Sequence, residues 1–187
     1  AAVAVHALSV GPDGWIAAIQ RQHSPNFDAR PPGTKIELIV VHNISLPPGR
    51  YGQGNVAQLF TNALDVGADP FFEQISGARV SAHLLIERDG SLVQFVSLLE
   101  RAWHAGDSNF EGRPRCNDFS IGIELEGTDY LPFTDAQYAS LAELTRALFA
   151  RYGRLDLAGH SDIAPGRKTD PGPRFDWARY RESVRAA

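Results

Sequence analysis

Two β-rich runs separated by an Asp-Gly dipeptide restrict the fold of this chain more than any other feature. Residues 80–86 and 91–96 are largely apolar or β-branched, and Asp89-Gly90 stands between them. Such a dipeptide between two such runs is the strongest short-range signal for a β-hairpin. A hairpin pairs its strands antiparallel, so the sheet that contains it is not a doubly wound, purely parallel one.

Other segments predict further strands and helices around this hairpin. Residues 37–42 form a short apolar run typical of a buried strand, residues 43–49 a loop, and residues 119–127 alternate as a strand does. Helices are expected around residues 56–63, from a capping box at Thr134 to a C-cap at Gly153, and from about Trp177 to Val184. Together these elements predict an α/β fold, with a mixed central sheet flanked by helices.

Composition limits the class of protein and its partners. The 187 residues, 43% of them hydrophobic, suffice for one domain over residues 1–187, with residues 1–13 as a loosely ordered N-terminal extension. The net charge is −4 and no basic stripe alternates with aromatic residues, so we expect no nucleic-acid partner. The apolar run over residues 1–8 is too short to span a bilayer, so we expect no membrane partner either. We also expect the protein to be a monomer.

Residues 159–173 are rich in loop residues and hold three groups with metal or catalytic chemistry. His160 and Asp170 are ten positions apart, with Lys168 between them, and His42 ends the apolar run 38–41. Two imidazoles and one carboxylate suffice for a catalytic zinc, which keeps its fourth position open for water. Asp170 precedes a proline, which favours an extended backbone and a fixed direction for its carboxylate. Because a single histidine is more often a hydrogen-bonded packing residue, spacing alone leaves the ligand set open.

The strand predicted over residues 119–127 carries two acids on one face. Ile121, Ile123 and Leu125 share one face of this strand, so Gly122, Glu124 and Glu126 share the other. Two interpretations stay open: a solvated edge with two surface carboxylates, or a face on which one carboxylate is the general base beside the metal. Lys168 also has two interpretations: a solvated cation, or the group that stabilises an oxyanion.

The single cysteine, Cys116, allows no internal disulfide, which fits a reducing compartment. Cys116 is expected to be a small packed residue, and a thiol nucleophile with His104 as its base is a weaker alternative. Arg113 and Arg115 flank it, either as a solvated basic loop or as ligands of carboxylates, since the guanidinium offers a planar fork of donors.

Five stretches resemble, in order, one family of enzymes. They are VVHNISLPPG at residues 40–49, VSAH at 80–83, RAWHAG at 101–106, NDFSIGIELEGTD at 117–129 and KTDPG at 168–172. They look like the zinc N-acetylmuramoyl-L-alanine amidases, which are related to phage lysozyme-amidases and peptidoglycan recognition proteins. Within that family the resemblance, over residues 14–180, is to the cytoplasmic AmpD type of peptidoglycan recycling.

The resemblance implies a function and a role for individual residues. It implies zinc-dependent cleavage, in the cytoplasm, of the amide between the lactyl group of an anhydro-muramyl sugar and L-alanine of the stem peptide, so the partner is an anhydro-muropeptide. The implied zinc ligands are His42, His160 and Asp170, with Glu124 as the base and Lys168 as the oxyanion-stabilising group. Asn43, Arg79 and Arg115 are the implied substrate-binding residues, with His83 and Trp103 lining the cleft.

Three features of this chain depart from the family pattern, and one alternative function stays open. Ser161 and Gly166 stand where Cys and Glu are expected, and the loop before His160 is shorter. The alternative function is a peptidoglycan-fragment binding module that does not cut, as in relatives that lost a zinc ligand. All three candidate ligands are present here, which favours catalysis.

Overall fold

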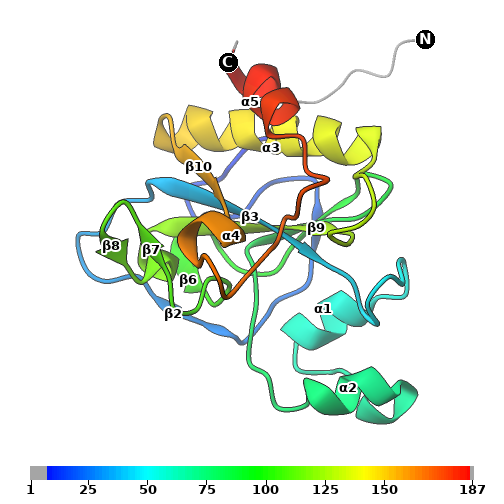
Figure 1. Ribbon diagram of the computed structural model, residues 1–187. Coiled ribbons are helices and arrows are strands. Elements are labelled where there is room, and N and C mark those ends of the chain that lie inside the picture. The colour runs from blue at the N-terminus through cyan, green and yellow to red at the C-terminus, as the bar shows by residue number, and fades with distance from the viewer. Residues whose placement is uncertain (1–7, 186–187) are drawn as a thin grey trace.

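A six-stranded mixed sheet forms the centre of the fold in the computed structural model, which describes residues 8–185 (Figure 1). The strand order is β1-β5-β4-β9-β3-β10. Their bounds are Gln20–Arg21, Leu92–Gln94, Leu84–Ile86, Ser120–Glu126, Leu38–Ile44 and Asp156–Gly159, in that order. The β4–β5 pair is antiparallel and the other four pairings are parallel, which confirms the mixed sheet.

The predicted hairpin is present but shorter than expected. Strands β4 and β5 pair with Leu84 opposite Gln94, and Gly90 in the turn has a φ of 87°. The His83 carbonyl still accepts from Phe95 N–H across the hairpin, but Ser81 bonds elsewhere: its N–H donates to the Trp103 carbonyl. A side chain at position 90 would also lie 2.9 Å from the Ala136 carbonyl oxygen, so glycine lets the turn approach the neighbouring helix.

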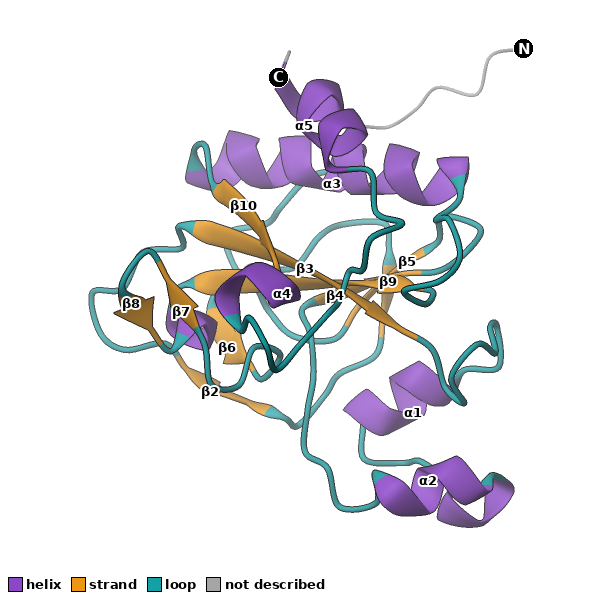
Figure 2. Cartoon of the chain, in the orientation of Figure 1, coloured by secondary structure: helices purple, strands orange, loops and turns teal. Residues whose placement is uncertain are grey.

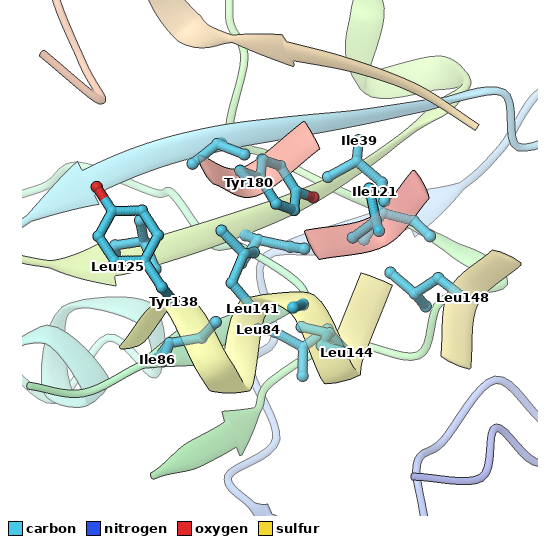
Figure 3. Close-up of a cluster of buried hydrophobic side chains, with 14 of the residues drawn as sticks. Ile39, Leu84, Ile86, Ile121, Leu125, Tyr138, Leu141, Leu144, Leu148 and Tyr180 are labelled. Carbon is cyan, nitrogen blue, oxygen red and sulfur yellow. The ribbon is translucent and has the colours of Figure 1, made fainter. Parts of the chain in front are cut away.

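Helices α3 (Asp135–Tyr152) and α5 (Trp177–Arg185) cover one face of the sheet (Figure 2). The capping box is confirmed: Thr134 Oγ1 accepts from Gln137 N, and Gln137 Oε1 accepts from Thr134 N, each at 3.1 Å. Gly153 ends α3 at a φ of 83°. Figure 3 shows the apolar core between α3, α5 and the sheet, which includes Ile39, Leu84, Ile121, Leu125, Leu141, Leu144, Leu148 and Tyr180.

Short elements lie on the other face of the sheet. Helices α1 (Asn55–Phe60) and α2 (Pro70–Gln74) follow the loop after β3, with a 3₁₀ helix η1 (Val66–Ala68) between them. The remaining elements are β2 (Phe27–Ala29) paired with β6 (Glu100–Ala102), β7 (Asn109–Phe110) paired with β8 (Arg113–Pro114), the 3₁₀ helix η2 (Cys116–Asp118) and α4 (His160–Ile163). The helix expected around residues 56–63 is therefore confirmed as α1.

Strand β9 is a central strand, so the solvated-edge interpretation is wrong. It lies between β4 and β3, and all seven of its residues are buried. Its two carboxylates, Glu124 and Glu126, are 8% and 7% exposed. Sequence alternation identified the two faces, but pairing with strands distant in the chain decides that both faces are covered.

Part of the segment expected to be loosely ordered packs against the fold instead. Val10 forms a β-bridge with Ile16, and Leu8 and Val10 pack against the core beneath α3, because their apolar side chains gain from burial there. Residues 1–7 of that expected extension lie outside the described residues. Within residues 8–185, no helix is long and apolar enough to cross a membrane.

Candidate active site

The register of three parallel strands builds a row of polar side chains at one end of the sheet. His42 on β3 lies opposite Glu124 on β9, and Val41 lies opposite Gly159 on β10. His160 follows Gly159 directly, so it stands beside His42. His160 is the first residue of helix α4, which corrects the expectation that it lies in a loop.

His42, His160 and Asp170 bring three ligand atoms to one point. His42 Nδ1 lies 3.0 Å from His160 Nδ1 and 3.1 Å from Asp170 Oδ2, and His160 Nδ1 lies 3.2 Å from the same oxygen. Tetrahedral bonds of about 2.0–2.1 Å separate two ligand atoms by about 3.3 Å. The three atoms therefore fit one small metal ion, and all three lie within 4.8 Å of one another.

The charge states of these groups suit a cation. Burial lowers the pKa of His42 below its usual value, although Asp170 opposes the shift. Burial also acts on Asp170, but hydrogen bonds with His160 and His42 outweigh it and hold the pKa of the carboxyl below its usual range. A neutral imidazole and an ionised carboxylate are the forms that bind metals.

The Glu124 carboxylate lines this site and has one buried oxygen without a hydrogen-bond partner. Its Oε1 lies 3.7 Å from His42 Nδ1, while its Oε2 is buried without a hydrogen-bond partner. Burial, reinforced by the nearby charge of Asp170, raises the pKa of Glu124 well above its usual value. A buried oxygen that is free to accept and a raised pKa are what a general base requires.

Glu126, two residues along the same face, is committed to backbone groups. Its Oε2 accepts from Gly52 N–H at 2.9 Å, and its Oε1 accepts from Arg88 N–H at 3.1 Å. Both oxygens are thus satisfied, and Glu126 ties two loops to β9 rather than facing the metal ligands.

Lys168 lies on the loop that also carries Asp170, and Asp129 fixes this loop. Asp129 Oδ2 accepts from Thr169 Oγ1 at 2.5 Å, and its Oδ1 accepts from Asn43 Nδ2 at 2.7 Å. The Asn43 amide also donates to the Pro171 carbonyl at 3.0 Å. Sequence reasoning missed Asp129, although its place three residues after a strand that carries a candidate base was a signal.

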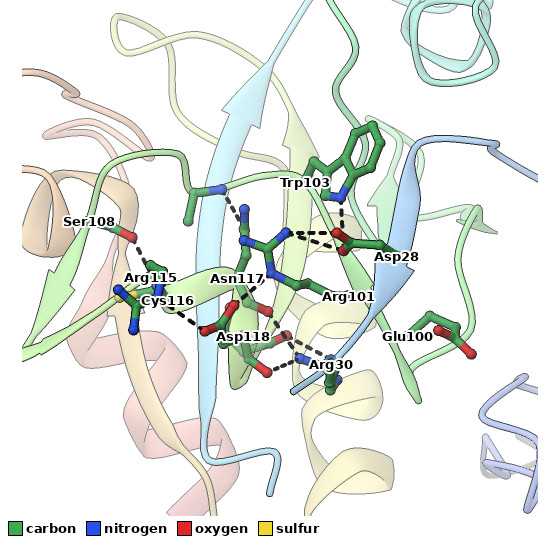
Figure 4. A network of polar contacts seen from close by, with 12 residues as sticks. Asp28, Arg30, Glu100, Arg101, Trp103, Ser108, Arg115, Cys116, Asn117 and Asp118 are labelled. Carbon is green, nitrogen blue, oxygen red and sulfur yellow. Dashed lines mark hydrogen bonds and ion pairs between the residues drawn. The ribbon is translucent and has the colours of Figure 1, made fainter. Parts of the chain in front are cut away.

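A pocket of about 680 Å³ opens over these groups. Its polar wall includes His42, Asn43, Glu124, Asp129, His160, Lys168 and Asp170, and its apolar wall includes Leu46, Phe71, Val80 and Trp103. The indole Nε1 of Trp103 donates to Asp28 at 3.1 Å, and Arg101 joins Asp28 to Asp118 (Figure 4). These bonds orient the aromatic wall of the pocket.

Three residues expected at the substrate lie outside the pocket lining. His83 is 0% exposed; its Nε2 donates to the Glu100 carbonyl and its Nδ1 accepts from Gly122 N–H, so the expectation that it lines the cleft is wrong. Arg79 is exposed and donates to its neighbour's carbonyl, and Arg115 pairs with Asp118.

Cys116 has none of the features of a nucleophile. It is buried outside the pocket, and burial raises the pKa of its thiol. His104, the base considered for it, instead turns its ring nitrogens to His42 and Ser120. These placements argue against thiol chemistry.

A family profile described as N-acetylmuramoyl-L-alanine amidase matches residues 32–173, which contain every candidate ligand. The chain belongs to this family. It is therefore an amidase, a hydrolase that acts on carbon–nitrogen bonds, and the mixed α/β fold agrees with its relatives.

Several relatives of this amidase are similar over nearly its whole length. The 1,6-anhydro-N-acetylmuramyl-L-alanine amidase AmpD of Escherichia coli K12 is 58% identical over 173 residues, 91% of this chain and 94% of the relative. A crystal structure of a selenomethionine AmpD derivative matches with a TM-score of 0.90 at 56% identity, covering 92% of this chain and 97% of that one. The E. coli amidase AmiD, in complex with anhydro-N-acetylmuramic acid-L-Ala-D-γ-Glu-L-Lys, matches at 29% identity with a TM-score of 0.58, covering 95% and 65%.

Proposed function

We propose that this amidase hydrolyses the bond between the lactyl group of 1,6-anhydro-N-acetylmuramic acid and L-alanine of the stem peptide, in peptidoglycan recycling. The relatives at 57–58% identity that carry this activity in their names support the substrate, as does the anhydromuropeptide bound by AmiD. The observation that carries the reaction is the buried, unpartnered Oε2 of Glu124 beside three convergent ligand atoms.

We propose zinc as the metal, held by His42, His160 and Asp170. Two imidazole nitrogens and one carboxylate oxygen form a donor set typical of catalytic zinc, with a fourth position left for water or substrate. Zinc in such a site supplies Lewis acidity, which polarises a carbonyl oxygen and brings the pKa of a bound water to about 7.

Glu124 and Lys168 then have complementary roles in the reaction. Glu124 accepts the proton of the attacking water and passes it to the leaving amine nitrogen, since an amide nitrogen leaves only when protonated. Lys168 lies on the pocket wall, and its proposed role is to stabilise the negative charge that develops on the carbonyl oxygen. Removing one such group typically lowers the rate on the order of a hundredfold or more.

Asn43 and Trp103 are proposed to contact the substrate from the pocket walls, and Arg79 and Arg115 to bind carboxylates of the stem peptide farther out. A guanidinium pairs two carboxylate oxygens at once, and an exposed pair of this kind contributes about 1 kcal/mol or less. Replacing either arginine by lysine should raise KM more than it lowers kcat. Steady-state kinetics on an anhydro-muramyl tripeptide with unchanged KM in both variants would remove these residues from the site.

The function is tested by digesting purified anhydro-muropeptide and intact peptidoglycan in parallel, with zinc content measured on the same sample. We expect one zinc per chain, cleavage of the soluble fragment, loss of activity with EDTA, and loss of zinc and activity together in His42→Ala. Stoichiometric zinc without cleavage of either substrate would instead support a binding module. Full metal occupancy in His42→Ala would contradict the ligand set.

We propose that the amidase works as a monomer in the cytoplasm, where soluble turnover fragments are recycled. The similarity to the recycling amidases supports this location. A reporter fused behind the native full-length N-terminus should stay inside the cell, and its export would contradict the proposal.

A further inference from the structure

The two ligand histidines both turn their second ring nitrogen to one dipeptide, His104-Ala105. His42 Nε2 lies 2.9 Å from His104 Nδ1, and His160 Nε2 lies 2.9 Å from the Ala105 carbonyl oxygen. A carbonyl oxygen only accepts, so the proton of His160 is on Nε2 and the lone pair of its Nδ1 is directed at the metal position. Ala105 therefore fixes the tautomer of one ligand.

The His42 tautomer depends on a side chain, because its partner His104 has both a donor and an acceptor nitrogen. For His42 Nδ1 to bind a metal, its proton must be on Nε2, and His104 Nδ1 must then accept that proton. The proton of His104 is then on its Nε2, which lies 3.0 Å from Ser120 Oγ, an oxygen able to accept. The reverse arrangement would put a proton on His42 Nδ1, in the metal position.

The surroundings hold His104-Ala105 against the sheet. Asn117 Oδ1 accepts from the backbone N–H of both residues, at 3.1 Å and 2.8 Å. A Cβ at Gly122 would lie 2.4 Å from His104 Cγ, so the His104 ring occupies the space that any side chain on β9 would need there. This close approach explains the glycine between two buried positions of a central strand.

We propose that His104 is a positioning residue for the metal centre: it accepts the Nε2 proton of His42, keeps His42 Nδ1 free for the ion, and has Ser120 and Gly122 as its supports. The proposal rests on the proposed metal site but concerns how that site is oriented. Hydrogen-bond partners of metal-bound histidines typically contribute a factor of 10–100 in metal affinity.

Two substitutions at position 104 separate an accepting role from a packing role. His104→Asn retains an oxygen acceptor close to the Nδ1 position but leaves a gap, whereas His104→Leu fills the space but accepts no hydrogen bond. We expect His104→Leu to weaken zinc binding about 10–100-fold and His104→Asn to stay within a few-fold of wild type. The readout is the zinc Kd from competition with a chromogenic chelator, alongside urea unfolding of the metal-free proteins. Wild-type affinity in His104→Leu, or an equal loss in both variants, would overturn the proposal.

Gly122→Ala keeps every polar group and displaces only the His104 ring, so it is a second test if His104→Leu does not fold. It should also weaken zinc binding at least tenfold, and unchanged affinity there would overturn the proposal. His83→Asn is the control, since the ring nitrogens of this buried histidine contact Gly122 N, the Glu100 carbonyl and Arg30 but no metal ligand; its zinc affinity should stay within about twofold of wild type. If wild type itself binds no zinc, the proposed function fails, an outcome distinct from failure of the His104 role.

Discussion

The two faces of the central sheet differ in how many polar side chains they bury, and β9 shows the difference most clearly. Ile121, Ile123 and Leu125 enter the apolar core under α3, while Glu124 and Glu126 are buried on the other face. Strand β3 shows the same difference only at its end: Ile39 and Val41 enter that core, whereas His42 lies on the opposite face after Leu38 and Val40, which belong to a second apolar cluster. The apolar face under α3 only buries apolar surface, which stabilises the fold, while the face of His42 and Glu124, the polar face, combines smaller apolar clusters with the chemistry.

The polar face stays buried because almost every group on it has a partner. Arg30, whose pKa burial lowers to about 10, donates to four carbonyl oxygens, those of Leu98, Asn117, Asp118 and Ser120. An unpartnered buried polar atom costs about 1–3 kcal/mol, so few are expected in a native fold, and the Arg30 Nε is one of them. The Oε2 of Glu124 is another, and it belongs to the carboxylate that lies beside the metal ligand His42.

The largest expected effect comes from the two acids of the polar face. Glu124→Gln should keep its zinc but lower kcat about 10²–10⁴-fold, because the amide cannot accept a proton from water. Glu126→Gln should leave kcat within a few-fold, but it should lower the free energy of unfolding by about 1–3 kcal/mol because one oxygen acceptor of the Gly52 and Arg88 N–H groups becomes a donor. The measurements are kcat, zinc content and the free energy of unfolding in urea, each for both variants and wild type. A crippled Glu126→Gln with an active Glu124→Gln would reverse the assignment.

On the apolar face we expect a substitution to change the free energy of unfolding and to leave catalysis unchanged. Leu144 on α3 is 0% exposed, and Leu144→Ala should lower the free energy of unfolding by about 2–5 kcal/mol through lost burial and a residual cavity. Zinc affinity and kcat of the folded fraction should not change. Leu144→Met, with nearly the same volume, should lose less than about 1.5 kcal/mol. Loss of zinc binding in Leu144→Ala would show that the two faces are coupled.

Local signals in the sequence predicted most of this fold and much of the candidate site. The Asp89-Gly90 hairpin, the Thr134 capping box and the alternation of β9 each involve neighbours along the chain, and all three are confirmed. His42 and Asp170 are 128 positions apart, and no local pattern pairs them; the family resemblance supplied that step.

What the sequence did not predict depends on pairing between distant segments. Parity put Glu124 and Glu126 on one face but could not separate them, because the donors that occupy Glu126 come from Gly52 and Arg88, far away in the chain. His83 was misplaced for the same reason: its partners are the backbone groups of Gly122 and Glu100. The pairing of β2 with β6 is equally non-local.

His83 gives the polar face a dependence on pH that the apolar face lacks. Burial lowers the pKa of His83 to about 3, from an unfolded value near 6.5. Below about pH 6.5 the unfolded chain therefore binds a proton at His83 that the folded chain excludes. The contribution of neutral His83 to the free energy of unfolding is fully present above about pH 6.5 and falls by up to about 1.4 kcal/mol per pH unit toward pH 3. Urea unfolding of metal-free wild type and His83→Asn at pH 7.5 and 5.5 should show a smaller loss in the variant. Equal losses would assign the acid sensitivity to other groups.

The smallest expected effect is at the start of α3, where a cap holds the helix that covers the apolar face. Thr134 Oγ1 accepts from Gln137 N–H and donates to the Arg88 carbonyl at 2.6 Å, so Thr134→Ala removes both bonds and should lower the free energy of unfolding by about 1 kcal/mol. Thr134→Ser retains the hydroxyl and should stay close to wild type. Because Gln137 also donates to the Glu126 carbonyl at 2.9 Å, this cap joins α3 to the backbone of the strand that carries Glu124. If the two faces are energetically separate, zinc affinity in Thr134→Ala equals that of wild type; a parallel fall in zinc affinity would mean that the cap also positions β9.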